Sequence, residues 1–171
     1  AVIELRARFD EQNNIQWAER MEEAGCTILY GAENIKVHSK VCLITRRDKG
    51  KIQYITQVGT GNYNEKTAKQ YTDLCLMTAR PEIGEDAAAL FRNMATANME
   101  GNYKQLLVSP YQLRDKCMEH IDREIAKGRD GYIFLKLNSI TDRKLIDKLA
   151  QASQAGVEVV SIPGPCALVA A

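Results

Sequence analysis

The stretch KVHSK, residues 36–40, places a histidine between two lysines at alternating positions. On an extended strand Lys36, His38 and Lys40 would share one face, because side chains two residues apart point the same way. Two neighbouring ammonium groups disfavour a proton on the imidazole, so a neutral ring is expected near pH 7. Such a ring can attack phosphorus while the lysines neutralise the oxygens of the group under attack. The alternative is a polar histidine at an exposed strand end, between two solvated lysines.

A second candidate element is the glycine-rich run GTGNYN, residues 59–64. Two glycines around a threonine, followed by Asn62 and Asn64, can turn backbone N–H groups inward as an anion-binding nest. The alternative is an ordinary exit from a strand into a loop. The run lacks the terminal Lys-Ser/Thr of a nucleotide P-loop, which excludes that motif.

Three further residues carry weaker predictions. Arg8 follows the first predicted strand and could bind phosphate through its guanidinium fork, or pair with Asp10 or Glu11. Asp73 starts a later strand and could accept the second N–H of an imidazole, or simply cap that strand. His120 lies among charges in a predicted helix, and we expect it to be structural.

Short β-branched runs alternate with amphipathic patterns, which predicts an α/β fold. The predicted strands are 1–7, 26–31, 38–47, 51–59, 71–79, 102–110, 131–139 and 157–162. The predicted helices are 13–25, 81–99 beginning after its proline and glycine, 111–128 and 141–156. The run DKG, 48–50, predicts a hairpin turn. Segments 17–31 and 145–161 both read as helix, Ala-Gly and strand, which suggests a duplicated half-domain with a boundary near 102–104.

Composition limits the partners. The 171 residues carry 23 basic and 22 acidic side chains, so a broad surface for polyanions is not expected, although a local basic pocket is. We expect no nucleic-acid partner. The five cysteines form no CxxC pair and lie mostly in apolar runs, as expected of buried, reduced thiols in a cytoplasmic protein. No signal peptide and no apolar run near the ~20 residues of a membrane span are recognised.

Taken together, the stretches ELRARFDEQNNIQWAERMEEAGC, KVHSKVCLITRR, VGTGNYNEKTAKQYTDLCLMTA and the run from LLVSP to QASQAGV resemble bacterial polyphosphate kinase, over roughly residues 1–160. They also match the looser phospholipase D pattern, HxK followed by G-[ST]-x-N. That pattern usually has an aspartate five residues after its lysine. Thr45 stands there instead, which favours a kinase over a phosphodiesterase.

The resemblance implies that His38 is itself phosphorylated, that ATP or ADP and inorganic polyphosphate are the substrates, and that Mg²⁺ is required. It places the Mg²⁺ on phosphates in the Arg8 region and assigns no direct ligand. Tyr71 and Asp73 match the family's YTD. The implied catalytic residues are His38, Lys40, Asn62 and Asp73, and the implied phosphate or nucleotide contacts are Arg8, Gly59, Thr60, Gly61 and Tyr71.

The implied fold is α/β, with a phospholipase D-like mixed sheet flanked by helices in residues 1–103 and the start of a second such unit in 104–171. The family's chain is several times longer and supplies a second essential histidine downstream. This chain is therefore expected to be a fragment with half an active site, inactive alone. A homo-oligomer and a parent enzyme peripheral to the membrane stay open.

Two rival functions also stay open. The first is a phospholipase D-type phosphodiesterase or nuclease, which would complete its site across a dimer. The second is an inactive fragment that only binds anions. The tail SIPGPCALVAA, residues 161–171, departs from the family and resembles a motif of S-adenosylmethionine-dependent methyltransferases. We assign it no function.

Overall fold

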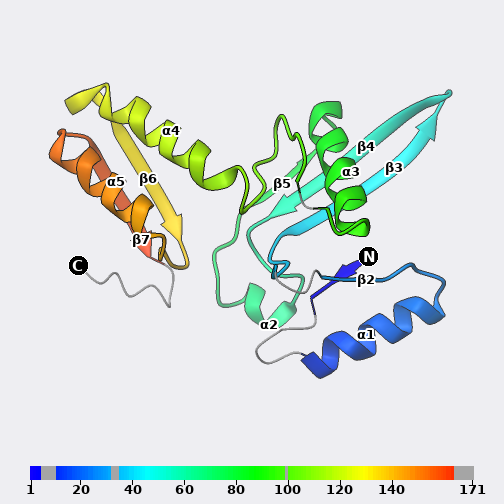
Figure 1. The fold of residues 1–171 in the computed structure, drawn as a ribbon. Coiled ribbons are helices and arrows are strands. Elements are labelled where there is room, and N and C mark those ends of the chain that lie inside the picture. The colour runs from blue at the N-terminus through cyan, green and yellow to red at the C-terminus, as the bar shows by residue number, and fades with distance from the viewer. Residues whose placement is uncertain (5–10, 32–34, 99, 164–171) are drawn as a thin grey trace. The chain divides into compact units, whose positions relative to one another are not determined.

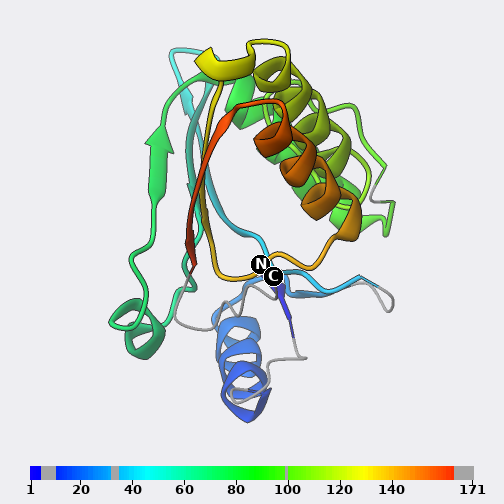
Figure 2. The same ribbon diagram turned by 90° about the vertical axis from the view of Figure 1, so that its left-hand side faces the viewer.

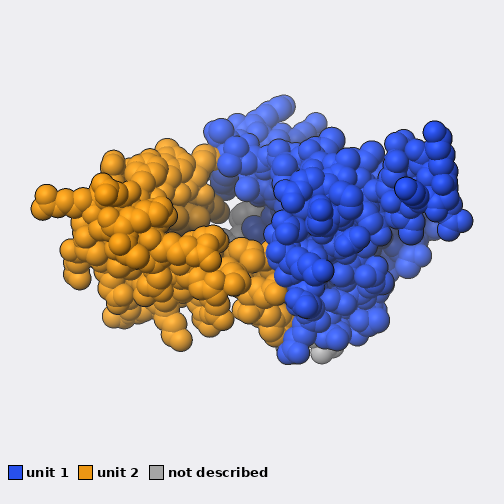
Figure 3. Space-filling view, turned by 90° about the horizontal axis from the view of Figure 1, so that it is seen from above, with its two compact units in different colours: residues 1–106 blue, residues 107–171 orange. Residues whose placement is uncertain are grey.

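The structure is a computed structural model that describes residues 1–4, 11–31, 35–98 and 100–163. The chain divides into two compact units, residues 1–106 and 107–171, which Figure 3 colours separately. The boundary predicted from the sequence lies after residue 103. Each unit is described by itself below.

The centre of the first unit is an antiparallel sheet of three strands, in the order β3 (Lys40–Asp48), β4 (Lys51–Gly59) and β5 (Cys75–Thr78) (Figure 1). The predicted hairpin at DKG is confirmed, because Asp48 pairs with Lys51 across the turn. Lys49 and Gly50 have φ values of 48° and 79°, the left-handed region that a two-residue hairpin turn requires. The turn fixes the register of β3 against β4, and thereby decides which side chains share a face.

One face of this sheet is covered by α3 (Pro81–Ala95), which packs on β4 and β3 (Figure 1). Its apolar side buries Ala87 and Leu90. The prediction that this helix begins after its glycine is wrong. Pro81 occupies the first turn, where its missing N–H costs nothing, and Gly84 is helical and buried against Tyr54.

Substitution of Gly84 by alanine is expected to destabilise the first unit. A Cβ at this position would overlap the Tyr54 side chain, and such overpacking costs about 1–3 kcal/mol, more than the ~1 kcal/mol gained in helix propensity. Thermal unfolding followed by circular dichroism measures the effect. Glu85→Ala, at an exposed position of the same helix, is the matched control and should leave the midpoint unchanged. A Gly84→Ala midpoint at or above that of the wild type would contradict the close packing.

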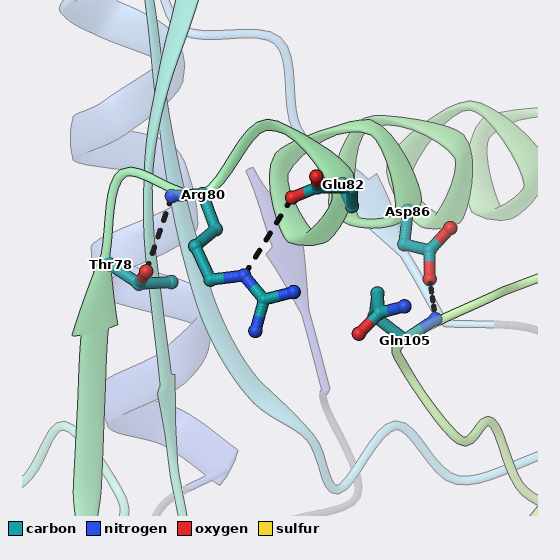
Figure 4. A network of polar contacts seen from close by, with 5 residues as sticks. All are labelled: Thr78, Arg80, Glu82, Asp86 and Gln105. Carbon is teal, nitrogen blue, oxygen red and sulfur yellow. Dashed lines mark hydrogen bonds and ion pairs between the residues drawn. The ribbon is translucent and has the colours of Figure 1, made fainter.

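The N-terminal half of α3 also forms hydrogen bonds to residues 104–106, the last residues of the first unit. Asp86 is 6% exposed, and its Oδ2 accepts the backbone N–H groups of Lys104, Gln105 and Leu106 at 2.9, 2.6 and 2.9 Å. Figure 4 shows the bond to Gln105, beside the pair of Arg80 and Glu82 at 3.7 Å. The predicted strand at 102–110 is wrong, because these amides donate to a carboxylate and not to a neighbouring strand.

The N-terminal part of the first unit pairs β1 (Val2–Ile3) with β2 (Leu29–Tyr30) in parallel, joined through α1 (Glu11–Glu23). The predicted helix is confirmed, whereas both predicted strands are shorter among the described residues. A short helix that the sequence did not suggest, α2 (Glu65–Ala68), follows β4. Asn64 caps α2 by accepting the N–H groups of Lys66 and Thr67.

The second unit contains α4 (Leu113–Ile125), the 3-10 turn η1 (Gly128–Asp130), β6 (Tyr132–Leu137), α5 (Arg143–Gln154) and β7 (Glu158–Pro163). β6 and β7 are parallel, and α4 and α5 lie on one face of the pair (Figure 2). The core of this unit is formed by Ile121, Ile133, Ala152 and Val157. The helices and strands predicted from residue 111 onward are confirmed, α4, α5 and β6 with shorter bounds and β7 shifted by one residue.

The two segments that echo each other in sequence have the same local arrangement. In each, a helix connects two parallel strands and ends at a glycine with positive φ, Gly25 at 86° and Gly156 at 93°. Among the described helices, none is long and apolar enough to cross a membrane.

Candidate functional site

The candidate site lies at one end of the sheet of the first unit, where β3 and β5 begin and β4 ends. Lys40 pairs with Gly59, and Gly59 pairs with Cys75, so these three positions form one row across the strands. Antiparallel pairing therefore brings the KVHSK stretch, the glycine-rich run and the YTD stretch to the same end of the sheet.

His38 precedes β3 and is exposed, whereas Lys40 is the first residue of the strand and only 9% exposed. The Lys40 ammonium donates to the backbone carbonyl of His38 at 2.6 Å, and its Nζ lies 3.3 Å from Nδ1 of the ring. The prediction that His38 lies within the strand is wrong. The lysine nonetheless reaches back to the ring, and it does so from a buried position.

His38 is exposed, but its ring is partly desolvated. This partial desolvation is the main cause that lowers the pKa of His38, and the charges of Lys40 and Lys36 lower it further. The sequence predicted this direction from the two charges alone. The pKa of Lys40 is also lowered, mainly by burial and in part by Lys36, while the carboxylate of Asp73 acts in the opposite direction. The site therefore combines an imidazole that disfavours a second proton with a desolvated lysine at its side.

Asp73 is positioned by the glycine-rich run. The Thr60 hydroxyl donates to Oδ1 of Asp73 at 3.0 Å and accepts the N–H of Leu74, also at 3.0 Å. A Cβ at Gly61 would overlap the Asp73 carboxylate, so glycine is needed here for close approach. The sequence suggested that Asp73 accepts the second N–H of His38. In the described part of the chain no such hydrogen bond forms, and Nδ1 faces Lys40 instead.

The other predicted residues are less tightly placed. Gly59 and Tyr71 are half-buried and Asn62 is exposed. Arg8 lies outside the described residues. Asn64, which the sequence analysis included in the nest, is the cap of α2. No group of three or more His, Cys, Asp or Glu side chains that could hold a metal ion is found among the residues with described positions.

A polar contact that sequence reasoning missed covers the end of the sheet. Tyr63 donates through its hydroxyl to Oε1 of Gln57, and Gln57 Nε2 donates to Sγ of Cys75 at 3.1 Å. The alternation of β4, which places Gln57 on the face of Gly59, was the available signal.

The cysteine prediction needs one correction. Cys26, Cys42, Cys75 and Cys117 are free, as predicted, but the first three are exposed and the fourth is half-buried. Cys42 and Cys75 pair with Gln57 and Gly59, which lie on the opposite face of β4 from Tyr54. Because Tyr54 packs on Gly84 of α3, the two cysteines lie on the face that α3 does not cover. An apolar run in the sequence therefore did not imply burial here.

Comparison with known proteins identifies the family. Residues 1–100 match the family model for polyphosphate kinase C-terminal domain 1, and residues 106–171 match the model for C-terminal domain 2. The second match runs to residue 171, so it includes the tail that the sequence analysis set apart from the family.

Individual relatives agree. Polyphosphate kinases from Bacillus cereus and Mycolicibacterium gilvum have sequence identities of 44% and 48% to this chain, in alignments that cover 98% of it. The crystal structure of polyphosphate kinase from Porphyromonas gingivalis superposes with a TM-score of 0.81 and 38% identity, over 98% of this chain and 29% of that one. This match confirms the predicted α/β, phospholipase D-like fold.

The chain spans about a quarter of the length of these curated relatives, 24% in each case. The first family model, over residues 1–100, includes His38, Lys40 and Asp73. The chain belongs to the polyphosphate kinase family.

Proposed function

We propose that this chain is part of an enzyme that transfers a phosphoryl group reversibly between ATP and inorganic polyphosphate, with His38 as the group that carries it. The observation that supports this proposal most directly is the pair formed by His38 and the buried Lys40. A ring beside a desolvated ammonium stays neutral, and the same ammonium lies within reach of the oxygens of a phosphoryl group on that ring.

In the first step, the lone pair of the unprotonated imidazole nitrogen attacks the γ-phosphorus of ATP. The N–P bond forms as the bond from phosphorus to the bridging oxygen breaks, and that electron pair leaves with ADP. In the second step, a terminal oxygen of polyphosphate attacks the same phosphorus and the N–P bond breaks. Lys40 stays beside the ring in both steps and neutralises the non-bridging oxygens.

Asp73 acts through Lys40 in this scheme. Its charge favours the protonated lysine against the cost of burial, so the ammonium is retained where a phosphate must bind. Thr60 and Gly61 hold the carboxylate in place. Asn62, Tyr71 and Arg8 remain proposed phosphate or substrate contacts on the basis of the family resemblance.

Magnesium suits this arrangement only as an ion that arrives with the nucleotide. Proteins commonly bind Mg²⁺ through one or two carboxylates plus substrate phosphates. Asp73 supplies one such carboxylate close to Lys40, and no larger acidic group is found among the described residues. When bound, the ion neutralises charge on the β- and γ-phosphate oxygens.

The choice between a kinase and a phosphodiesterase is tested with two substrates. The chain is incubated with γ-labelled ATP and Mg²⁺, and separately with a chromogenic phosphodiester without nucleotide. Half an active site is expected to be inactive in the full reaction, so the assay measures the first step alone: we expect acid-labile label on the protein and no diester hydrolysis. Diester hydrolysis without nucleotide would favour the phospholipase D-type rival.

If neither reaction occurs, residues 1–171 are placed in the matching segment of the Bacillus cereus enzyme. Failure of that chimaera to be labelled, although folded, would overturn the proposal.

The pH dependence of labelling should reflect the lowered pKa of His38. Attack requires the neutral ring, so the rate should hold its plateau below pH 6.5 and fall only as pH drops through the lowered pKa. Lys36→Gln removes one cause of the lowering, so the pKa rises and the acid limb moves to higher pH. At low salt we expect the ratio of the rate at pH 6 to the rate at pH 8 to be smaller in this variant than in the wild type. The difference should vanish at high salt because Lys36 is exposed. If the ratio of the rates at pH 6 and pH 8 is the same in Lys36→Gln and in the wild type, Lys36 does not affect the pKa of His38.

A further inference from the structure

The far end of the β3–β4 hairpin carries a cluster of positive charge. Residues 46–51, RRDKGK, hold four basic side chains and one acidic one, and all six residues are exposed. We call these six residues the hairpin tip. Their net charge exceeds the +1 of the whole chain, so the tip is a local basic surface on a nearly neutral protein.

The charges of the hairpin tip are not compensated within the molecule. Asp48 accepts a hydrogen bond from the neutral amide of Gln53 at 3.2 Å, and the same amide accepts from Nε of Arg46 at 2.8 Å. Within the described structure, none of the four cations of the tip forms an ion pair. Like charges held this close repel one another, so the cluster favours an external anion.

The tip and the candidate site lie at opposite ends of the same strand. β3 runs from Lys40 beside His38 to Asp48 in the tip, a distance of about 26 Å at ~3.3 Å per residue. Between them β3 contributes only Val41, Cys42, Leu43, Ile44 and Thr45, none of which is charged. A short anion can therefore occupy one end at a time, whereas a long linear polyanion can reach both.

We infer that the hairpin tip is a second anion-binding surface, which holds the distal part of a polyphosphate chain whose reacting end lies at His38. This inference rests on the proposed function for the identity of the ligand. The tip offers no aromatic side chain on which a nucleic-acid base could stack, and the exposed apolar residue beside it is Ile52. A ligand of phosphates alone fits this surface better than RNA or single-stranded DNA does.

Binding of fluorescent long-chain polyphosphate, followed by anisotropy at low salt, tests the inference. The variant Arg47→Gln with Lys49→Gln should bind the long chain about tenfold more weakly and should show a shallower salt dependence. Its affinity for tripolyphosphate should stay at the wild-type value, because the short anion does not need the tip. The matched control is Arg129→Gln with Lys144→Gln, which removes the same two charges at exposed positions of the second unit and should change neither affinity.

Each other outcome has a definite meaning. Equal long-chain affinity in the tip variant and the control, with both folded by circular dichroism, overturns the inference. RNA that binds through the tip as tightly as polyphosphate overturns the choice of ligand. Labelling of His38 by ATP is measured in parallel: if it fails while binding through the tip persists, the proposed function fails and the tip remains an anion site. If labelling succeeds and binding ignores the tip, only the further inference fails.

Discussion

Replacement of His38 by alanine should abolish acid-labile labelling of the protein by γ-labelled ATP. In the proposed reaction the phosphoryl group is bound to the imidazole of His38. Alanine offers no nucleophile in its place, so no N–P bond can form at this site. Quenched samples, compared after acid and after base treatment, distinguish phosphohistidine from a phosphate ester. We expect the label to fall to background, and the circular dichroism spectrum to stay that of the wild type because His38 is exposed.

The chain offers a matched control, since it contains two histidines. His120 lies in α4 in the second unit and is exposed, so His120→Ala should keep full labelling. If the His38 variant keeps the label and the His120 variant loses it, the nucleophile lies in the second unit and the assignment of His38 is wrong. Loss of label in both would indicate that the assay measures folding and not the nucleophile.

Replacement of Lys40 by methionine should separate activity from stability. Lys40 is 9% exposed and its ammonium is desolvated. An apolar side chain of similar length avoids the cost of desolvation, so the thermal midpoint should stay the same or rise. Labelling should nevertheless fall by about 10²–10³-fold, the usual result of removing one preorganised donor from the oxygens of a reacting group.

The measurement is best made at pH 8. Loss of Lys40 removes one of the causes that lower the pKa of His38, and at pH 8 the ring is neutral in both proteins. The rate difference then reports the contact with the phosphoryl oxygens and not the protonation of the ring. Lys36→Met, which removes an exposed charge, is the control, and its labelling rate should fall far less than that of Lys40→Met. A Lys40→Met rate within tenfold of the wild type would remove the lysine from the proposed mechanism.

Elements with a strong local pattern were predicted well from the sequence. The strand 51–59 has the predicted bounds, and the hairpin turn at DKG follows from the left-handed residues that such a turn demands. The strand 102–110 was predicted wrongly from its apolar letters. Its amides are taken by Asp86, a side chain 18 or more residues away, and such a contact leaves no periodic signal. The start of β5 shifted for a similar reason, since Leu74 donates its N–H to Thr60.

The candidate site divides in the same way. The approximate position of His38 beside two lysines, and the direction of its pKa, follow from five consecutive letters. The burial of Lys40 depends on its pairing with Gly59 across the sheet. The contact of Asp73 with Thr60 depends likewise on β5 lying beside β4. The register of β3 against β4 follows from the DKG turn, whereas the register of β5 against β4 and the burial that results from it are not encoded in a local pattern.

The carboxylate of Asp86 defines where the first unit can be cut. Three consecutive amides bonded to one buried oxygen leave residues 104–106 little freedom to rotate, so a hinge between the units has to lie beyond Leu106. A gene truncated after residue 106 would keep all three donors. One truncated after residue 100, where the first family model ends, would leave a buried carboxylate without these donors, at a cost of several kcal/mol.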